Sequence, residues 1–263
     1  GEESLAKLRS AGTLSKHLVA GFKWLPPVMR PPKILALALN FQEHIDETSL
    51  DFFNEPIVFA KYPSNMIADG EEIVLPPFPQ KVDEECELAV VIGRDARNIL
   101  ASEADGHIFG YTNFIDGSAR GVPAFYQMKA RETFAPIGPW ITTADEIDDP
   151  MKLQIQLKVN GELKQNFNTD DMAHNIAKSI AWVSSIHTLE PGDILATGTN
   201  HRGLSALQGG DSVELEVEGC GTLHISIQDD LGRTWPRTTR LERQEAGFDT
   251  PAEQATGKYT PGS

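Results

Sequence analysis

Residues 83–93 join an acidic segment to an apolar one, and this combination constrains the fold more than any other stretch. Residues 88–92 are apolar without interruption and end at Gly93, which is typical of a strand buried on both faces. Successive side chains of a strand point to opposite faces, so Glu85 and Glu87 share one face and Cys86 takes the other. The stretch therefore predicts a central strand that the rest of the chain covers on both sides.

Glu85 and Glu87 would place two carboxylates on the same face of the predicted strand. They would lie about 7 Å apart along the strand and repel each other unless a cation lies between them. A hard divalent cation with oxygen ligands would relieve this repulsion. The alternative is a solvated acidic segment, residues 83–87, that leads into a strand beginning only at Leu88. The spacing alone leaves both interpretations open.

Alternating apolar residues and turn pairs predict a mainly β protein with few helices. Apolar and polar residues alternate over residues 153–159, where Asn160-Gly161 then turns the chain. They alternate again over residues 213–217 and 223–227, on either side of the turn 219–221. Each pattern predicts a hairpin. Shorter strands are predicted at residues 34–39, 57–61, 110–115, 139–143 and 194–197, and residues 66–75 are expected to be extended with a turn at Asp69-Gly70.

Helices are expected at few places. Residues 172–187 carry apolar side chains at helical spacing, and Thr169 or Asp170 would cap this helix. A short helix is expected at residues 102–104. From about Arg240 the chain is polar and rich in Gly, Pro, Thr and Glu, which predicts a disordered tail or an exchange arm.

Proline pairs and charge suggest how the chain is organised. The pairs at 26–27 and 31–32 mark a boundary that helices do not cross, so residues 1–33 are expected to form an arm or small leading segment. Residues 34–239 would form the catalytic domain, and residues 240–263 the polar tail. The formal net charge of −15 opposes binding to nucleic acid or to anionic lipid.

Cysteine usage and missing signals narrow the class of protein further. Two cysteines, neither of them in a CxxC pair, disfavour a thiolate metal site and fit a reducing compartment, so we expect a cytoplasmic protein. No apolar stretch approaches the roughly 20 residues of a membrane helix, and residues 1–30 lack a signal-peptide core. Neither a phosphate loop nor the nucleophile elbow of serine hydrolases occurs.

His44 and Glu47 form the first candidate catalytic pair. They lie three residues apart in a polar loop, residues 40–54, and on a helical turn they would share one face. The carboxylate would then hold the imidazole in one tautomer, and His44 would act as a general base for a water molecule. The alternative is a surface histidine beside an acidic loop.

Asp116, Arg120 and Lys129 form a second group. Asp116 precedes Gly117 at the end of the predicted strand 110–115, where its carboxylate would project into a cleft or simply turn the chain. Arg120 and Lys129 would receive a substrate carboxylate, or pair with Glu85 and its neighbour Glu87 as structural partners. Both interpretations stay open.

A third candidate is the glycine-bracketed loop of residues 198–203. Its sequence, Gly-Thr-Asn-His-Arg-Gly, follows a predicted strand, so Thr199 and the backbone N–H groups could face an anion. His201 is equally consistent with a ligand and with a plain loop residue. The loop lacks the form of a phosphate loop, so no nucleotide site is indicated.

Four motifs in order resemble those of the fumarylacetoacetate hydrolase superfamily, particularly its acylpyruvases and 2-hydroxyhepta-2,4-diene-1,7-dioate isomerases. The resemblance spans roughly residues 34–235, and the agreement of several motifs makes it specific. The motifs are residues 40–47 (NFQEHIDE) for NYxxHxxE, 85–88 (ECEL) for ExEL, 116–120 (DGSAR) for DxSAR, and Lys129 with 136–140 (PIGPW) for K…PxGPW. The segments 157–163, 189–193 and 198–199 agree as well.

The resemblance implies a mixed β-roll or β-sandwich that holds one divalent cation, Mg²⁺, Mn²⁺ or Ca²⁺. The implied ligands are Glu85, Glu87 and Asp116, an oxygen set that suits a hard cation. The cation would polarise a carbonyl of a 2-oxo acid or diketo acid substrate and stabilise an enolate. Family members are usually homodimers, so we expect a homodimer here.

The resemblance also assigns roles to the remaining candidates. His44, oriented by Glu47, would activate water. Lys129 and Arg120 would hold the oxygen atoms of the substrate and its developing negative charge. Substrate contacts are further assigned to Thr199, which would hydrogen-bond the substrate carboxylate, and to Phe41 and Arg202.

Three departures from the family pattern bear on the reaction and the substrate. Phe41 replaces the usual tyrosine, and Pro123 stands where hydrolytic members often place a glutamine that positions water. Residues 200–202, Asn-His-Arg, replace a proline-containing loop. Arg202 is therefore expected to help form a basic wall around the distal end of the substrate.

The leading hypothesis is a metal-dependent hydrolase that cleaves a carbon–carbon bond in an acylpyruvate-like 1,3-dicarbonyl acid. Oxaloacetate decarboxylation, keto–enol tautomerisation or isomerisation, and hydration of a 2-oxo-alkenoate are alternatives, because each passes through an enolate. An alternative of another class is a non-catalytic module that binds a metal and a 2-oxo acid.

Overall fold

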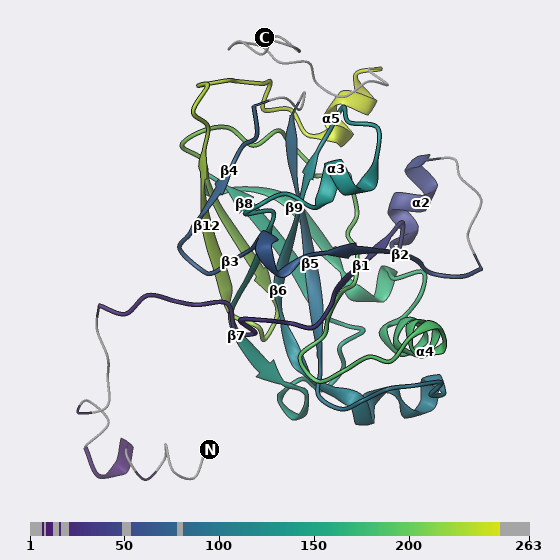
Figure 1. Ribbon diagram of the computed structural model, residues 1–263. Coiled ribbons are helices and arrows are strands. Elements are labelled where there is room, and N and C mark those ends of the chain that lie inside the picture. Colours follow the sequence, from purple (N-terminus) through teal and green to yellow (C-terminus); the bar gives the residue numbers. More distant parts are fainter. Residues whose placement is uncertain are drawn as a thin grey trace.

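Figure 1 shows the computed structural model, which describes residues 21–48, 54–77 and 81–247, together with residue 7, residues 9–12 and residue 16. The side chains of residues 47 and 48 lie outside the described part. Strands dominate and helices are few, which confirms the predicted fold class. No helix among the described residues combines the length and the apolar character that crossing a membrane requires.

Two curled sheets hold the strands. The seven-stranded sheet runs in the order β2 (Ile57–Lys61), β1 (Ile34–Ala38), β10 (Ile194–Ala196), β5 (Val82–Ile92), β6 (Ile108–Ala119), β7 (Ala135–Thr143), β3 (Met66–Ile67). The five-stranded sheet runs in the order β4 (Glu72–Val74), β12 (Thr222–Gln228), β11 (Ser212–Val217), β8 (Gln154–Val159), β9 (Glu162–Asn168).

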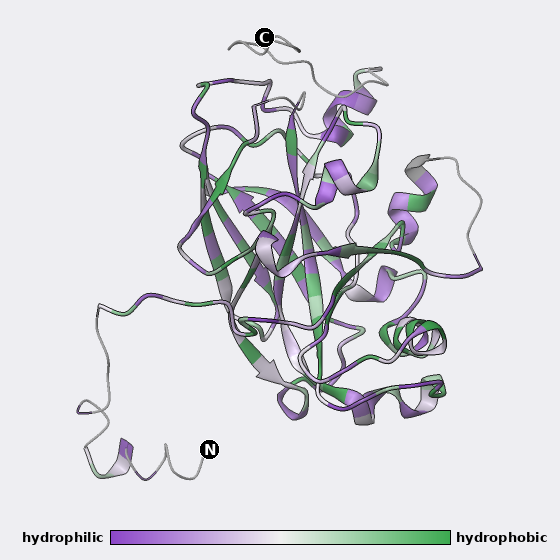
Figure 2. Cartoon of the chain, viewed as in Figure 1, coloured by the Kyte–Doolittle hydropathy of each residue, from purple (hydrophilic) through white to green (hydrophobic). Residues whose placement is uncertain are grey.

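Short helices connect and flank these sheets. The α-helices are α2 (Gln42–Thr48), α3 (Phe125–Lys129), α4 (Ile176–Ile186) and α5 (Arg240–Glu245). The 3₁₀ turns are η2 (Pro63–Asn65), η3 (Ala101–His107), η4 (Ala144–Glu146) and η5 (Thr169–Asp171). Figure 2 shows apolar segments gathered in the central strands, whereas α2 and α5 at the periphery are mainly hydrophilic.

Strand β5 is the centre of the larger sheet. It lies between β10 and β6, and every one of its residues is buried. Because the strand begins at Val82, the acidic residues 83–87 lie inside it, with backbone groups paired to β6. The alternative in which a solvated acidic segment led into a strand at Leu88 is therefore wrong.

Strand β6 continues where the sequence predicted a break. Asp116 and Gly117 lie inside the strand, so the predicted end at residue 115 and the reading of this pair as a turn are both wrong. A Cβ atom on Gly117 would lie 2.9 Å from the ring of Phe134 and 3.1 Å from its Cα. The glycine therefore serves close packing against Phe134, whose carbonyl accepts a 3.0 Å hydrogen bond from the Gly117 N–H.

The five-stranded sheet follows the predicted pattern closely. Both hairpins form, β8 with β9 and β11 with β12. In β8 the side chains of Ile155, Leu157 and Val159 are buried while their neighbours are half-buried, as alternation along a strand requires. These side chains join those of the larger sheet in the main hydrophobic core.

The helices differ from the predicted ones more than the hairpins do. Helix α4 begins only at Ile176, and its cap is Asn175, whose Oδ1 accepts a 2.8 Å hydrogen bond from the N–H of Lys178. The predicted caps, Thr169 and Asp170, belong to the separate turn η5, so the predicted start of this helix was wrong. The short helix expected at residues 102–104 is part of the longer 3₁₀ turn η3.

Helix α5 lies in the segment predicted as a polar tail. Thr239 and Glu242 form a capping box that starts it. The N–H groups of Arg240 and Leu241 donate 2.8 Å hydrogen bonds to the carbonyls of Leu204 and Arg202. Up to residue 247 this segment is therefore ordered against the loop that follows β10, and residues 248–263 lie outside the described part.

Candidate metal centre and active site

Three buried carboxylates meet where β5 and β6 pair. Glu85 lies directly opposite Asp116 in the strand register, and Glu87 follows on the same face of β5. One oxygen atom from each of the three lies within 4.8 Å of the other two. Oxygen atoms at this separation fit around one cation with bonds of about 2.0–2.6 Å. The structure thus brings together the three residues predicted as metal ligands.

Two lysines surround this carboxylate cluster. Lys129 of α3 donates hydrogen bonds to Glu85 Oε2 at 2.8 Å, to Ser118 Oγ at 2.6 Å and to Asp116 Oδ2. Lys61, the last residue of β2, is buried and donates to Asp116 Oδ1. Lys61 is not among the residues predicted for the site. The available signal was a lysine that closes a short apolar strand in an acidic protein.

The pKa values of Glu85 and Glu87 are shifted in opposite directions. Burial, followed by the charges of Asp116 and Glu85, raises the pKa of Glu87 well above its usual value. Burial also acts to raise the pKa of Glu85, but the charges of Lys129 and Arg120 outweigh it and lower that pKa well below the usual value. Glu87 receives a 2.7 Å hydrogen bond from the N–H of Gly198. The cluster therefore lacks positive charge at Glu87, which a divalent cation would supply.

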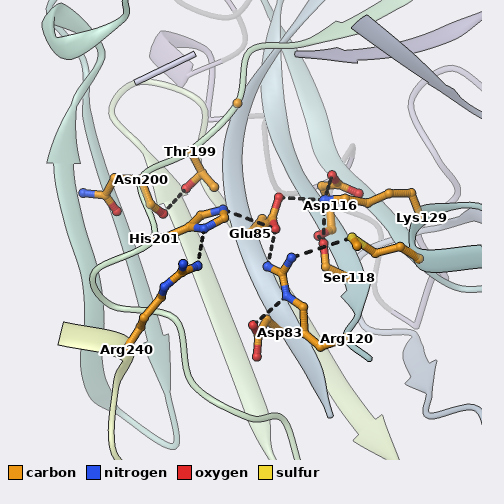
Figure 3. Close-up of polar contacts among 12 residues, drawn as sticks. Asp83, Glu85, Asp116, Ser118, Arg120, Lys129, Thr199, Asn200, His201 and Arg240 are labelled. Carbon is orange, nitrogen blue, oxygen red and sulfur yellow. Dashed lines mark hydrogen bonds and ion pairs between the residues drawn. The ribbon is translucent and has the colours of Figure 1, made fainter. Parts of the chain in front are cut away.

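Arg120 lines the cavity and bridges two acidic residues of β5. Its Nη2 donates to Glu85 Oε1 at 2.6 Å and its Nε donates to Asp83 Oδ2 at 2.9 Å, while Nη1 lies 3.7 Å from the sulfur of Met128. Lys81 also pairs with Asp83, at 2.9 Å. The structural pairing considered for Arg120 is thus present, and Figure 3 shows its guanidinium between the two acidic residues.

Two histidines stack at the opposite side of Glu85. The rings of His44, on α2, and His201 lie 3.4 Å apart between centroids, tilted by 33°. Nδ1 of His201 lies 2.7 Å from Nη1 of Arg240, and its Nε2 lies 3.4 Å from Glu85 Oε1 (Figure 3). Because a guanidinium only donates, Nδ1 accepts and the ring proton of His201 lies on Nε2, toward Glu85.

Both histidine rings are buried and neutral. Burial lowers the pKa of His201 to about 4. Burial, followed by the neighbouring His201, lowers the pKa of His44 to about 2. His44 therefore keeps a free ring nitrogen at neutral pH, which a general base needs. The reading of His44 as an exposed surface residue is wrong, since its relative exposure is 8%.

Helix α2 is tied to the loop after β10. Glu43 accepts a 2.8 Å hydrogen bond from Asn200 Nδ2 and pairs with Nη1 of Arg202 at 3.2 Å. Arg202 is therefore directed to α2, and it is not among the residues that line the cavity beside the carboxylates. The side chain of Glu47, predicted to orient His44, lies outside the described part.

Thr199 and Phe41 have different surroundings. Thr199 is buried, accepts a 3.1 Å hydrogen bond from Gln165 Nε2 and lines the cavity. Phe41 packs edge-on against Phe167 with ring centroids 5.0 Å apart, in the hydrophobic core rather than in the cavity lining. Pro123 is exposed and also lies outside the lining.

The cavity beside Glu85 has a volume of about 320 Å³. One part of its wall is polar and the other is apolar. The polar lining residues are His44, Glu85, Arg120, Lys129, Thr199 and His201, and the apolar ones are Leu37, Ala38, Leu39, Ile57, Phe59, Phe125 and Met128.

The chain is similar in sequence to a known protein family and to a human enzyme. The sequence profile described as the C-terminal part of fumarylacetoacetate hydrolase matches residues 33–228. The human mitochondrial oxaloacetate tautomerase FAHD2A is 38% identical over 216 residues, which cover 76% of this chain and 68% of that protein.

Two solved structures are similar in fold and sequence. Maleylpyruvate hydrolase from Sphingobium sp. SYK-6, in complex with manganese(II) and pyruvate, is 33% identical with a TM-score of 0.73, covering 86% of this chain and 83% of that one. 2-Hydroxyhepta-2,4-diene-1,7-dioate isomerase from Mycobacterium marinum is 33% identical with a TM-score of 0.70, covering 78% of this chain and 77% of that one.

Proposed function

Because the chain belongs to the fumarylacetoacetate hydrolase family, we propose that it is a divalent-metal-dependent hydrolase of acylpyruvate-like 2-oxo acids. The reaction would break a carbon–carbon bond of a 1,3-dicarbonyl acid and release pyruvate and a second carboxylic acid. The observation that carries the proposal is the convergence of three carboxylates within 4.8 Å, beside a cavity that His44 also lines.

Glu85, Glu87 and Asp116 would hold the cation, Mg²⁺, Mn²⁺ or Ca²⁺. When bound, the cation would act as a Lewis acid toward the carbonyl oxygens of the substrate. The manganese and pyruvate in the maleylpyruvate hydrolase structure support a 2-oxo acid beside such a site. The raised pKa of Glu87, caused by burial and by Asp116 and Glu85, supports a cation at this position rather than a merely structural acidic cluster.

The remaining side chains would supply the acid–base chemistry and the binding contacts. His44 would take a proton from the attacking water, and an anionic substrate in the cavity would raise the pKa of this imidazole toward its working range. Lys129 would stabilise negative charge that develops on the substrate. Thr199 would hydrogen-bond the substrate carboxylate, and Arg120 would keep Glu85 oriented while it contacts the substrate oxygens.

A second candidate is keto–enol tautomerisation or isomerisation at the same site. Two observations favour it: the 38% identity to an oxaloacetate tautomerase and the exposed Pro123, where hydrolytic members often place a water-positioning glutamine. In this case His44 would move a proton between carbon and oxygen without activating water. Decarboxylation, hydration and simple binding without turnover are the further alternatives.

Product analysis with Mn²⁺ or Mg²⁺ present distinguishes these reactions. Acetopyruvate should yield pyruvate and acetate, as measured by NMR, whereas enol oxaloacetate should show only slow conversion to the keto form in the ultraviolet. His44→Ala should abolish turnover while Mn²⁺ and oxalate binding by calorimetry stay nearly unchanged. His224→Ala, at an exposed histidine paired with Asp69, is the matched control. Turnover that survives in His44→Ala would contradict the assignment of the base.

The proposal extends to assembly and location. We propose a homodimer in the cytoplasm that binds neither nucleic acid nor membranes, in keeping with the formal net charge of −15. Light scattering during size-exclusion chromatography would test the dimer, and cell fractionation would test the location. A stable monomer that is fully active would contradict the first part.

A further inference from the structure

The cavity beside Glu85 has a charged end and an apolar end. Both cations in its lining belong to the charged end, where Arg120 pairs with Asp83 and Glu85, and Lys129 pairs with Glu85 and Asp116. Each is committed to carboxylates that the fold itself buries. At this end the site is therefore equipped for the 2-oxo acid group, whose oxygens a cation and these donors would share.

The apolar end is built by the paired strands β1 and β2 together with helix α3. Ala38 lies opposite Ile57 in the register of β1 with β2, so the end of one strand and the start of the other form a single wall. The ring of Phe59 lies 5.3 Å from the ring of Phe125 on α3. Lys129 Nζ lies 5.3 Å from the same Phe59 ring, which places Phe59 at the border between the two ends.

Leu39, which belongs to this wall, has a backbone conformation that is unfavourable for leucine. Its φ angle is 52°, in the left-handed region that leucine rarely adopts. The next residue, Asn40, is clamped by its side chain, which donates to the carbonyls of Thr197 at 2.8 Å and His174 at 3.1 Å. Such strain persists only where the surrounding structure imposes it, and it recurs at ligand-binding sites. Here it keeps an apolar side chain in the cavity lining.

The lining lacks a partner for a second carboxylate among the described residues. Arg202, the cation expected near the distal end of the substrate, pairs instead with Glu43 and lies outside the lining. A carboxylate placed against Leu39, Ile57 and Phe125 would lose part of its hydration without gaining a counter-ion. An alkyl group placed there would gain free energy from every CH₂ removed from water.

From this arrangement we infer that the substrate is a 2-oxo acid with one carboxylate and an apolar distal group. The distal group lies against Leu39, Ile57, Phe59 and Phe125, and these residues determine specificity. The inference rests on the proposed function, because it takes the carboxylate cluster as the binding site of the 2-oxo acid group. Dicarboxylic 2-oxo acids would therefore bind less tightly to this site.

A matched pair of ligands tests the inference without turnover. 2-Oxohexanoate and 2-oxoadipate have the same six-carbon chain, which ends in a methyl group in the first and in a carboxylate in the second. With Mn²⁺ present, calorimetry should show that 2-oxohexanoate binds more tightly by about tenfold or more. Equal or tighter binding of 2-oxoadipate would overturn the inference and leave the proposed function intact. Failure of both to bind, with Mn²⁺ bound, would overturn the proposed function and the inference with it.

Variants at the apolar wall provide the second measurement. Ile57→Arg should reverse the preference toward 2-oxoadipate, because it supplies the missing counter-ion. Phe125→Lys, at a side chain that is 52% exposed, makes the same change where folding is least affected. Leu163→Arg, on an exposed position of β9, is the matched control and should keep the original preference. An unchanged preference in both wall variants, with Mn²⁺ binding intact, would overturn the assignment of this wall.

Discussion

The two sheets of this protein are built by opposite rules. In β8 and β11 of the five-stranded sheet, buried apolar side chains alternate with more exposed polar ones. No described residue of this sheet lines the cavity, although Gln165 of β9 hydrogen-bonds Thr199, which does. In the seven-stranded sheet, the central strand β5 buries four acidic side chains, at residues 83–85 and 87. Buried charges cost free energy unless they are paired, and Asp83 and Glu85 have such partners, so the cost in β5 falls on Glu84 and Glu87, whose pKa values are raised. The candidate metal ligands therefore lie in the larger sheet, whereas both sheets contribute to the main hydrophobic core.

Glu87→Gln should produce the largest effect and should affect function alone. Removing one charged oxygen ligand is expected to weaken Mn²⁺ binding by more than about 100-fold, since even indirect partners of a metal ligand are worth about 10–100-fold. Stability without metal should not fall, because burial and the nearby Asp116 and Glu85 already raise the pKa of this carboxyl. Calorimetry with Mn²⁺ and urea unfolding would measure the two quantities.

Glu214→Gln on β11 is the matched control for this change. Its side chain is half-buried in the five-stranded sheet, so neither Mn²⁺ binding nor activity should change. Normal Mn²⁺ affinity in Glu87→Gln would exclude Glu87 from the metal site and remove the proposed contrast between the sheets.

Leu215→Ala should produce the reverse pattern. Leu215 is fully buried in β11, opposite Leu157 on one side and Leu223 on the other. Truncation is expected to lower the free energy of unfolding by about 2–5 kcal/mol, through lost burial and the cavity that remains. Mn²⁺ affinity at a temperature where the variant is folded should equal that of the wild type. A parallel loss of affinity would show that the two sheets are not separable in this way.

Glu84→Gln tests a buried acid of β5 that forms no ion pair with any described residue. Burial, followed by the charge of Asp83, raises the pKa of Glu84 well above its usual value. A raised folded-state pKa gives stability that is present below the unfolded pKa of about 4.3 and is lost as the pH rises through the folded pKa. The variant should therefore gain stability over the wild type between pH 5 and pH 8, by about 1 kcal/mol or more. Urea unfolding with a chelator present would measure this, and a constant difference would contradict it.

Arg240→Met should have a modest effect, confined to turnover. The side chain of Arg240 holds Nδ1 of His201, whose ring stacks on His44, so Arg240 is a positioning residue. Losing a charged hydrogen bond of about 1.4 kcal/mol would lower kcat about tenfold with little change in KM. Arg240→Lys keeps a donor and should restore part of the rate. A loss confined to KM would place Arg240 in substrate binding instead.

The fold was predictable where local pattern and global structure agree. The hairpin over residues 153–168 follows from alternation and from Asn160-Gly161, because both signals are local. The break predicted at Gly117 failed because that glycine serves packing against Phe134, a contact 17 residues away that no local pattern reveals. Helix α5 departs from the predicted tail because Thr239 and Glu242 form a capping box, a local signal that the polar composition of the segment obscures.

The site was predictable as a set of residues more than as a set of contacts. Strand periodicity alone places Glu85 and Glu87 on one face, but bringing Asp116 opposite them required the pairing of β5 with β6. Lys61 and Arg240 reach the site from distant segments, 55 residues from Asp116 and 39 from His201, so sequence spacing could not indicate them. Arg202 shows the converse, because a basic residue in the right loop turned toward Glu43 instead of the cavity.

The lysines around Asp116 indicate that a cation would bind after the chain has folded. Lys61 and Lys129 already donate hydrogen bonds to this carboxylate, and Lys129 and Arg120 neutralise Glu85. These cations already neutralise part of the negative charge of the cluster, so the chain should fold without a metal ion. Addition of a chelator should therefore not unfold the protein. An ion that arrives after folding is selected from whatever the surroundings offer, so supply within the cell would decide which divalent ion this protein carries.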